Sequence, residues 1–147
     1  MPIRAVLDTN VLISGLVAEG GAPRMIVDAW LEEQFTLVIS PYLLEELLHV
    51  LTYPRIAGRI RLREEDLAVL LGALVGRAEV TEGTLSLPGV TRDPKDDPVV
   101  ACAREGNADY IVSGDQDLLV LGEYEGIRVV SPREFAEILK ALTHRQK

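Results

Sequence analysis

The sequence alternates short, almost wholly apolar runs with longer segments of helical periodicity. The apolar runs are rich in valine and isoleucine and cover residues 3–7, 35–39, 110–112 and 127–130, with a weaker run at 77–81. Such short, nearly continuous apolar character is typical of strands buried on both faces, as in a parallel sheet. Helical periodicity fills the intervals, at residues 11–17, 23–33, 42–51, 64–75, 99–104 and 133–142. The alternation predicts an α/β fold in which helices layer a sheet.

The bulk properties favour one domain in a reducing compartment. The chain has 147 residues, 48% of them hydrophobic and 26% charged, which suits a single packed domain over residues 1–142 with a short tail at 143–147. No signal-peptide pattern follows Met1, and the longest apolar stretch, residues 67–76, is too short to span a bilayer. The single cysteine, Cys102, cannot form an internal disulfide and lies on an apolar helix face. We expect a cytoplasmic protein without membrane contact.

The net charge argues against nucleic-acid binding by bulk electrostatics. It is −8, with a pI near 4.8, whereas proteins that gain affinity by neutralising phosphates are basic. The objection weakens if several acids form a metal site, because a bound divalent ion reverses the local field. One segment is basic: Arg55, Arg59, Arg61 and Arg63 fall within nine residues. They form either a solvated helix face or an edge that contacts phosphates.

Acidic residues gather at the ends of the predicted strands and at the starts of the following helices. Asp8 follows the first strand, Glu45 and Glu46 lie in the helix that follows the second strand, and two further groups come later. These groups are Asp93, Asp96 and Asp97 in one loop, and Asp115 and Asp117 after another strand. Parallel strands bring their carboxyl ends to one edge of the sheet, where ligands bind. A carboxylate cluster there suits Mg²⁺ or Mn²⁺.

Each acid also has a plainer explanation. Asp8, one acid of the Asp93–Asp97 loop and Asp115 could each serve as a helix N-cap, which needs only one carboxylate. In the helix at 42–51, Glu46 lies beside the edge of the apolar arc, but periodicity does not firmly separate it from Glu45. Convergence of the carboxylates would favour the metal site, because like charges held together destabilise a fold unless a cation compensates.

Other common catalytic devices are missing from the sequence. The two histidines, His49 and His144, fall on a polar helix face and in the tail, and no Ser/His/Asp arrangement is evident. Neither a GxxxxGK[ST] loop nor a GxGxxG loop is present. Nucleophilic hydrolysis and nucleotide binding through these loops are therefore disfavoured.

Four blocks of the chain, taken in order, resemble the PIN-domain family of metal-dependent ribonucleases. They run from Leu7 to Leu12, Ser40 to Leu47, Arg92 to Pro98 and Ala108 to Leu119. The pattern is most similar to the branch of VapC-like toxins of toxin–antitoxin pairs. The resemblance implies a central sheet of about four or five parallel strands, with helices on both faces.

The resemblance also implies a site and its chemistry. By motif position the metal-binding and catalytic acids are Asp8, Glu46, Asp96 and Asp115, and they would hold one or two Mg²⁺ or Mn²⁺ ions. Further candidates are the ligands Asp97 and Asp117 and the supporting residues Asn10 and Ser113. The implied reaction is metal-assisted hydrolysis of an RNA phosphodiester. The implied partners are RNA, a protein antitoxin and a second copy of the chain, as a homodimer or higher oligomer. The doubled acids Glu45/Glu46 and Asp96/Asp97 leave one-residue ambiguities.

Two rival functions remain open at this point. The chain could be a non-catalytic PIN module that binds RNA or protein, which predicts neither metal affinity nor RNA cleavage. It could instead be a Mg²⁺-dependent phosphatase on another α/β sheet. Asp8-Thr9-Asn10 disfavours the phosphatase, because it lacks the second aspartate of a haloacid-dehalogenase-like Asp-x-Asp loop.

Overall fold

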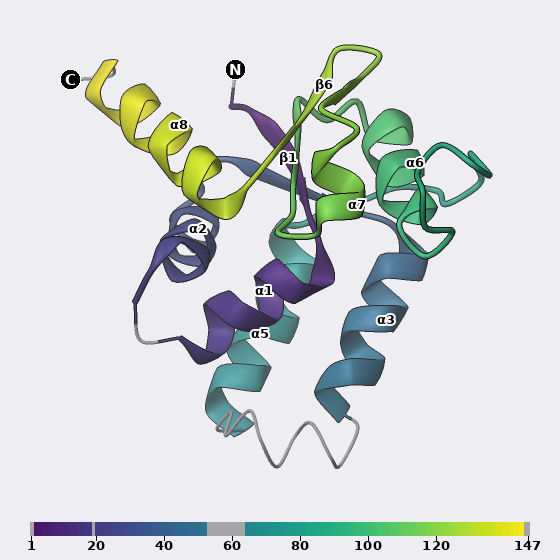
Figure 1. The fold of residues 1–147 in the computed structure, drawn as a ribbon. Coiled ribbons are helices and arrows are strands. Elements are labelled where there is room, and N and C mark those ends of the chain that lie inside the picture. The colour runs from purple at the N-terminus through teal and green to yellow at the C-terminus, as the bar shows by residue number, and fades with distance from the viewer. Residues whose placement is uncertain (1, 19, 53–63, 146–147) are drawn as a thin grey trace.

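A six-stranded sheet runs through the molecule in the order β3-β2-β1-β4-β6-β5 (Figure 1). The computed structural model describes residues 2–18, 20–52 and 64–145. The strands are β1 (Arg4–Leu7), β2 (Thr36–Ile39), β3 (Glu79–Val80), β4 (Tyr110–Val112), β5 (Glu123–Tyr124) and β6 (Ile127–Val130). All pairings are parallel except that of β5 with β6. The predicted α/β fold with a central parallel sheet is therefore confirmed, with one antiparallel strand added at an edge.

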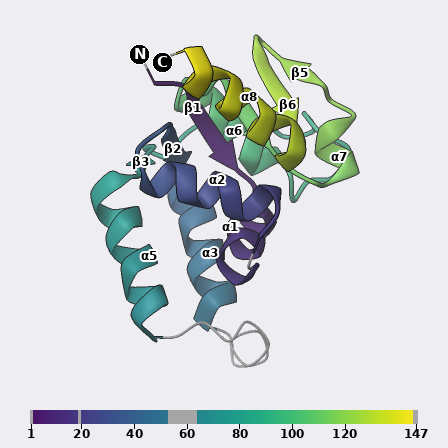
Figure 2. The ribbon, with the colours of Figure 1, turned by 90° about the vertical axis from the view of Figure 1, so that its left-hand side faces the viewer.

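The added strand, β5, forms a hairpin with β6. Tyr124 pairs with Ile127, so Glu125 and Gly126 form the turn between them. Both turn residues have positive φ, 48° and 87°, as two-residue hairpin turns of type I′ require. A strand of two residues carries no readable periodicity, so the sequence pattern did not predict it. Figure 2 shows β3 and β5 near opposite ends of the sheet.

Helices cover both faces of the sheet. They are α1 (Thr9–Val17), α2 (Ala22–Leu31), α3 (Pro41–Thr52), α5 (Glu64–Arg77), α6 (Asp97–Glu105), α7 (Gln116–Leu119) and α8 (Pro132–Arg145). On one face α6 contacts β1, β2 and β4 with α3 beside it, whereas α2 and α8 pack together on the other (Figure 1). Phe135 of α8 packs edge-on against Phe35, with ring centroids 5.2 Å apart. Of the helices in the described ranges, none has the length and apolar character needed to cross a membrane.

Two helices begin at serine caps. The Ser40 hydroxyl accepts from the Leu43 amide at 3.1 Å, and Ser131 and Glu134 form a reciprocal capping box. One acid of the Asp93–Asp97 loop was a candidate cap for the helix that follows. This helix, α6, begins at Asp97, and the preceding Asp96 makes no cap hydrogen bond with its side chain. Neither carboxylate is therefore accounted for as a helix cap.

The order of the strands reverses at β1. From β1 the chain moves outward to β2 and β3, then crosses back to β4 on the other side of β1 and continues to β6. Such a topological switch point is where open α/β sheets bind ligands, beyond the carboxyl ends of the strands. Leu7 pairs with Val112 in register, so Asp8 and Ser113 leave the sheet side by side. The fold thus places two of the predicted site residues at this position.

Candidate active site at the switch point

A chain of hydrogen bonds joins the ends of β1 and β4. The Ser113 hydroxyl donates to Asp8 Oδ2 at 2.8 Å and accepts from the Asp115 amide at 3.0 Å. Asp115 Oδ1 in turn accepts from the Asp117 amide at 2.9 Å, which caps the short helix α7. Ser113 is fully buried. One hydroxyl therefore orients the Asp8 carboxylate and the segment that carries Asp115.

A pocket of about 170 Å³, here called the acidic pocket, lies at this edge of the sheet. It contains the four acids singled out by motif position, which come from β1, α3, the loop before α6 and the start of α7. Leu43 and Glu46 line it together because residues three apart share one face of a helix. Its lining is Asp8, Asn10, Leu43, Glu46, Asp93, Lys95, Asp96, Val99 and Asp115.

The pocket concentrates negative charge that the described residues do not balance. Burial, followed by the charges of Asp115, Asp8 and Asp93, raises the pKa of Asp96 to about 7. Burial also raises the pKa of Asp8, against the lowering effect of the Ser113 hydrogen bond. The pKa of Glu46 is raised by burial and by the charge of Asp8. Since two like charges 4 Å apart repel by about 4 kcal/mol at an effective dielectric of 20, this arrangement favours a cation.

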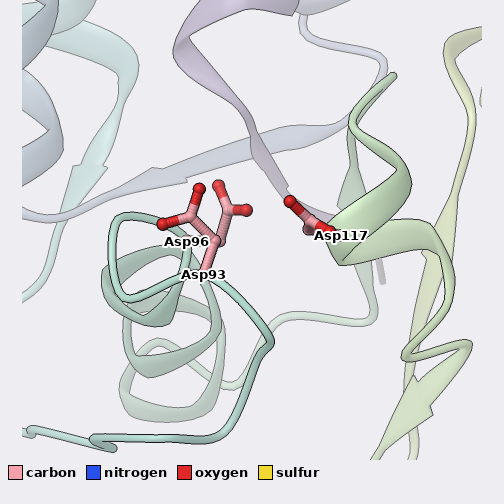
Figure 3. Close-up of side chains that lie close together, drawn as sticks. All are labelled: Asp93, Asp96 and Asp117. Carbon is pink, nitrogen blue, oxygen red and sulfur yellow. The ribbon is translucent and has the colours of Figure 1, made fainter.

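A second, tighter group of acids extends the pocket. Asp93, Asp96 and Asp117 each offer a carboxylate oxygen, and these oxygens lie within 4.8 Å of one another (Figure 3). Asp117 also pairs with Arg92, with Asp117 Oδ1 2.9 Å from Nη2. Asp93 Oδ1 accepts from the Lys95 amide at 3.0 Å, which fixes the loop locally. Asp93 and Asp96 belong to both groups and so connect them.

A model of the PIN domain matches residues 4–117, which is more than half of the chain. This chain belongs to the PIN domain family. It is 29% identical over 143 residues to the uncharacterized protein MJ1680 of Methanocaldococcus jannaschii, spanning 92% of this chain and 90% of that one. PIN domains are nucleases, so the acidic pocket lies in a fold associated with phosphodiester hydrolysis.

Solved structures share the fold at low sequence identity. The crystal structure of VapBC2 from Rickettsia felis, bound to a DNA fragment from their promoter, has a TM-score of 0.55 and 14% identity, covering 88% of this chain and 98% of that chain. The crystal structure of FitAcB from Neisseria gonorrhoeae has a TM-score of 0.47 and 18% identity, with the same coverage. At 14% identity the likeness to the Rickettsia felis protein concerns the fold.

The remaining predicted residues of this PIN domain lie in different places. Asn10 lines the acidic pocket, whereas Glu45 is exposed and is not part of its lining. The Asp97 carboxylate accepts from the Gly89 amide and from the Thr91 amide and hydroxyl, at 2.9, 2.9 and 2.6 Å. Asp97 therefore binds the preceding loop and does not line the acidic pocket. The predicted RNA-contacting arginines, Arg55, Arg59, Arg61 and Arg63, lie outside the described residues.

The structure adds two residues that the sequence did not single out as site residues. Asp93 lies three residues before Asp96, and Lys95 lies between them, and both line the acidic pocket. The only sequence signal for Asp93 was the crowding of three aspartates into one short loop. The lining contains five acids and one basic residue, which is Lys95.

The residues present fit a hard divalent cation. Asp96 Oδ2 is buried and, within the described part of the chain, has no hydrogen-bond partner, so it is free to act as a ligand. The other acidic residues of the lining offer carboxylate oxygens, which are the ligands that Mg²⁺ and Mn²⁺ prefer. Ser113 holds the Asp8 carboxylate and the backbone amide of Asp115, so both residues are oriented without a bound ion.

Proposed function

We propose that this PIN domain is a metal-dependent endoribonuclease that hydrolyses RNA phosphodiester bonds. The observation that carries the proposal is the meeting of Asp8, Glu46, Asp96 and Asp115 in one pocket at the switch point of the sheet. These acids come from distant parts of the chain, and burial, followed by the charges of the neighbouring acids, raises the pKa of Asp96 to about 7. A fold gains nothing in stability from such an arrangement, whereas a cation site requires it.

Each residue has a role in the proposed site. Asp8, Glu46, Asp96 and Asp115 would hold one or two Mg²⁺ or Mn²⁺ ions, with Asp93 and Asp117 as further ligands. Such ions, when bound, lower the pKa of water and offset the charge that develops on the phosphate. Ser113 keeps Asp8 and Asp115 in place through its two hydrogen bonds. Lys95 would attract the phosphate to the rim of the pocket.

We further propose that the protein is the toxin of a toxin–antitoxin pair. Support comes from its PIN domain and from the fold it shares with VapBC2 of Rickettsia felis. In this proposal a protein antitoxin covers the acidic pocket and blocks RNA. A small open reading frame overlapping the gene would supply the candidate antitoxin. Its co-expression should relieve growth arrest caused by the wild-type chain, and an arrest that persists with the partner bound would contradict this pairing.

A matched pair of variants tests the nuclease proposal. Glu46→Gln removes a charge from the acidic pocket, whereas Glu45→Gln removes one from the neighbouring residue, which does not line the pocket. Cleavage of a fluorescent single-stranded RNA with Mn²⁺ should fall by roughly 100-fold in Glu46→Gln and by less than about twofold in Glu45→Gln. EDTA should abolish cleavage by the wild type.

Three outcomes would point to other functions. Cleavage that survives EDTA and Glu46→Gln would come from a contaminating nuclease. Absence of both Mn²⁺ binding and RNA cleavage would favour a non-catalytic binding module. Turnover of p-nitrophenyl phosphate with no cleavage of RNA would favour a phosphatase. A DNA strand of the same sequence, assayed in parallel, would separate ribonuclease from general nuclease activity.

A further inference from the structure

A second and larger cavity, here called the Tyr42 pocket, lies beside the acidic pocket. Its volume is about 370 Å³, within the range of roughly 300–1,000 Å³ that is usual for sites holding small organic ligands. Its walls are mainly apolar and contain several rigid rings. The principal lining residues are Tyr42, Leu85, Leu87, Pro88, Pro94 and Pro98. Tyr42 is 54% exposed, so its ring is accessible to a ligand in this pocket.

One wall of this pocket is held by two carboxylates of α6. Glu105, in the last turn, accepts from the amides of Gly83, Thr84 and Leu85 at 2.7–3.0 Å. Asp97, in the first turn, accepts from the amides of Gly89 and Thr91. The segment between these anchors contributes Leu85 to Pro88 to the pocket. The wall is therefore fixed in shape before any ligand arrives, which reduces the entropy lost on binding.

The Tyr42 pocket and the acidic pocket share walls. Tyr42 lines the first and Leu43 the second, and the same division occurs between Pro94 and Lys95. It occurs again between Asp97 and Asp96. Since consecutive Cα atoms are about 3.8 Å apart, the two cavities are separated by roughly one residue. In a nucleotide the base is joined to the phosphate through one sugar. A nucleotide whose phosphate lies in the acidic pocket can therefore place its base in the Tyr42 pocket.

The charge of the protein indicates what kind of group this is. At −8 the chain gains little affinity for RNA from phosphate neutralisation. Contacts away from the phosphates would then add to those made at the metal site, and stacking of bases on aromatic side chains provides such contacts for single strands. A nucleobase is flat and uncharged, and both properties match a cavity walled by a tyrosine, prolines and leucines. The sugar–phosphate backbone matches neither.

We propose that the Tyr42 pocket binds one nucleobase of single-stranded RNA, stacked on Tyr42, next to the phosphate that is cleaved in the acidic pocket. The inference rests on the proposed ribonuclease function and adds the substrate contact that helps to position the reacting bond. Single-stranded RNA fits and a duplex does not, because the base must leave its stack to enter the pocket.

A kinetic experiment on the full-length chain with Mn²⁺ tests the stacking. Tyr42→Ala should raise the KM for single-stranded RNA roughly tenfold and leave kcat within about threefold, because it removes binding away from the reacting centre. Tyr42→Phe keeps the ring and should match the wild type. Val75→Ala, on the exposed face of α5, serves as the surface control. Mn²⁺ affinity should be unchanged in all three variants.

A binding experiment tests whether the base is the group that the Tyr42 pocket binds. Adenosine and uridine 5′-monophosphates, added with Mg²⁺ to the ¹⁵N-labelled protein, should shift the amide signals of Leu85, Ser86 and Leu87. Ribose 5-phosphate lacks the base and should leave these signals in place, and Tyr42→Ala should lose the shifts. Equal shifts with ribose 5-phosphate, or a wild-type KM in Tyr42→Ala, would overturn the proposal. Base-dependent shifts without RNA cleavage would support base binding in the Tyr42 pocket and contradict the proposed ribonuclease function.

Discussion

Ser113 donates its hydroxyl hydrogen to the Asp8 carboxylate at 2.8 Å, across 105 positions of sequence. The bond forms because β1 and β4 are neighbouring parallel strands that end at the same edge of the sheet. The same hydroxyl accepts from the Asp115 amide, so one buried side chain connects two acids of the proposed metal site. The proposed site is thus built at the ends of the two central strands of the sheet.

Removing this hydroxyl should weaken metal binding without removing a ligand. Ser113→Ala leaves every carboxylate in place but frees Asp8 to rotate and leaves the Asp115 amide without its acceptor. Loss of such a supporting hydrogen bond typically lowers metal affinity by roughly 10–100-fold. Calorimetric titration with Mn²⁺ measures the effect. Ser131→Ala, which removes the helix cap of α8, is the control and should lower stability while Mn²⁺ affinity stays unchanged.

Asp8→Asn should keep the fold and lose most of the Mn²⁺ affinity. The substitution preserves shape but removes charge at a position where the proposed ligand set depends on charge. Mn²⁺ should raise the melting temperature of the wild type, because a ligand that binds only the folded state stabilises it. The variant should show little of this rise. An equal rise in both proteins would mean that Asp8 is only the residue that precedes α1.

The metal-free protein should lose stability as pH rises towards neutrality. Burial and the neighbouring acids raise the pKa of Asp96 from 3.8 to about 7, so the folded state holds this proton more tightly than the unfolded state. The stabilisation from that proton is complete below the unfolded pKa and is lost as pH rises through the folded one. Melting temperatures measured in EDTA should show this fall between pH 4 and 7. Asp96→Asn should remove this fall in melting temperature.

Metal binding should show the opposite dependence on pH. A divalent ion must displace the Asp96 proton, so Mn²⁺ affinity should rise by at most about tenfold per pH unit and level off above a pH of about 7. Calorimetry in buffers of different ionisation enthalpy would count the protons released. Affinity that is constant from pH 5.5 to 8 would place Asp96 outside the ligand set.

Asp96 and Asp97 should behave differently although they are adjacent. Hydrogen bonds from Thr91 and Gly89 lower the pKa of Asp97, so its contribution to stability is present above the ordinary value of 3.8 and is lost in acid. Asp97→Asn should lower the melting temperature at pH 7 and leave Mn²⁺ affinity within about threefold. Asp96→Asn should do the reverse: raise the metal-free melting temperature and abolish Mn²⁺ binding. Interchanged results would assign the ligand to Asp97.

The sequence was sufficient for the fold class and for the general position of the acids. Strands buried on both faces must be almost wholly apolar, so β1, β2, β4 and β6 were recognisable from composition alone. Acids placed directly after such strands must lie at the sheet edge, which is why Asp8 and Asp115 were predicted together. The two strands of two residues were harder to detect: β3 fell within the weaker run at 77–81, and β5 was not predicted.

Only the tertiary structure decided which acids meet. Periodicity places Glu46 beside the edge of the buried side of its helix but does not firmly separate it from Glu45. The packing of Leu43 and Leu47 turns Glu46 towards the acidic pocket. In the loop before α6 no period applies, and the direction of each side chain follows from long-range contacts. Thr91 and Gly89 hold Asp97 away, while Asp93 and Asp96 face Asp117 from another part of the chain. Chain order alone does not contain these distances, because they arise only when β1 and β4 pair and bring both loops to one edge.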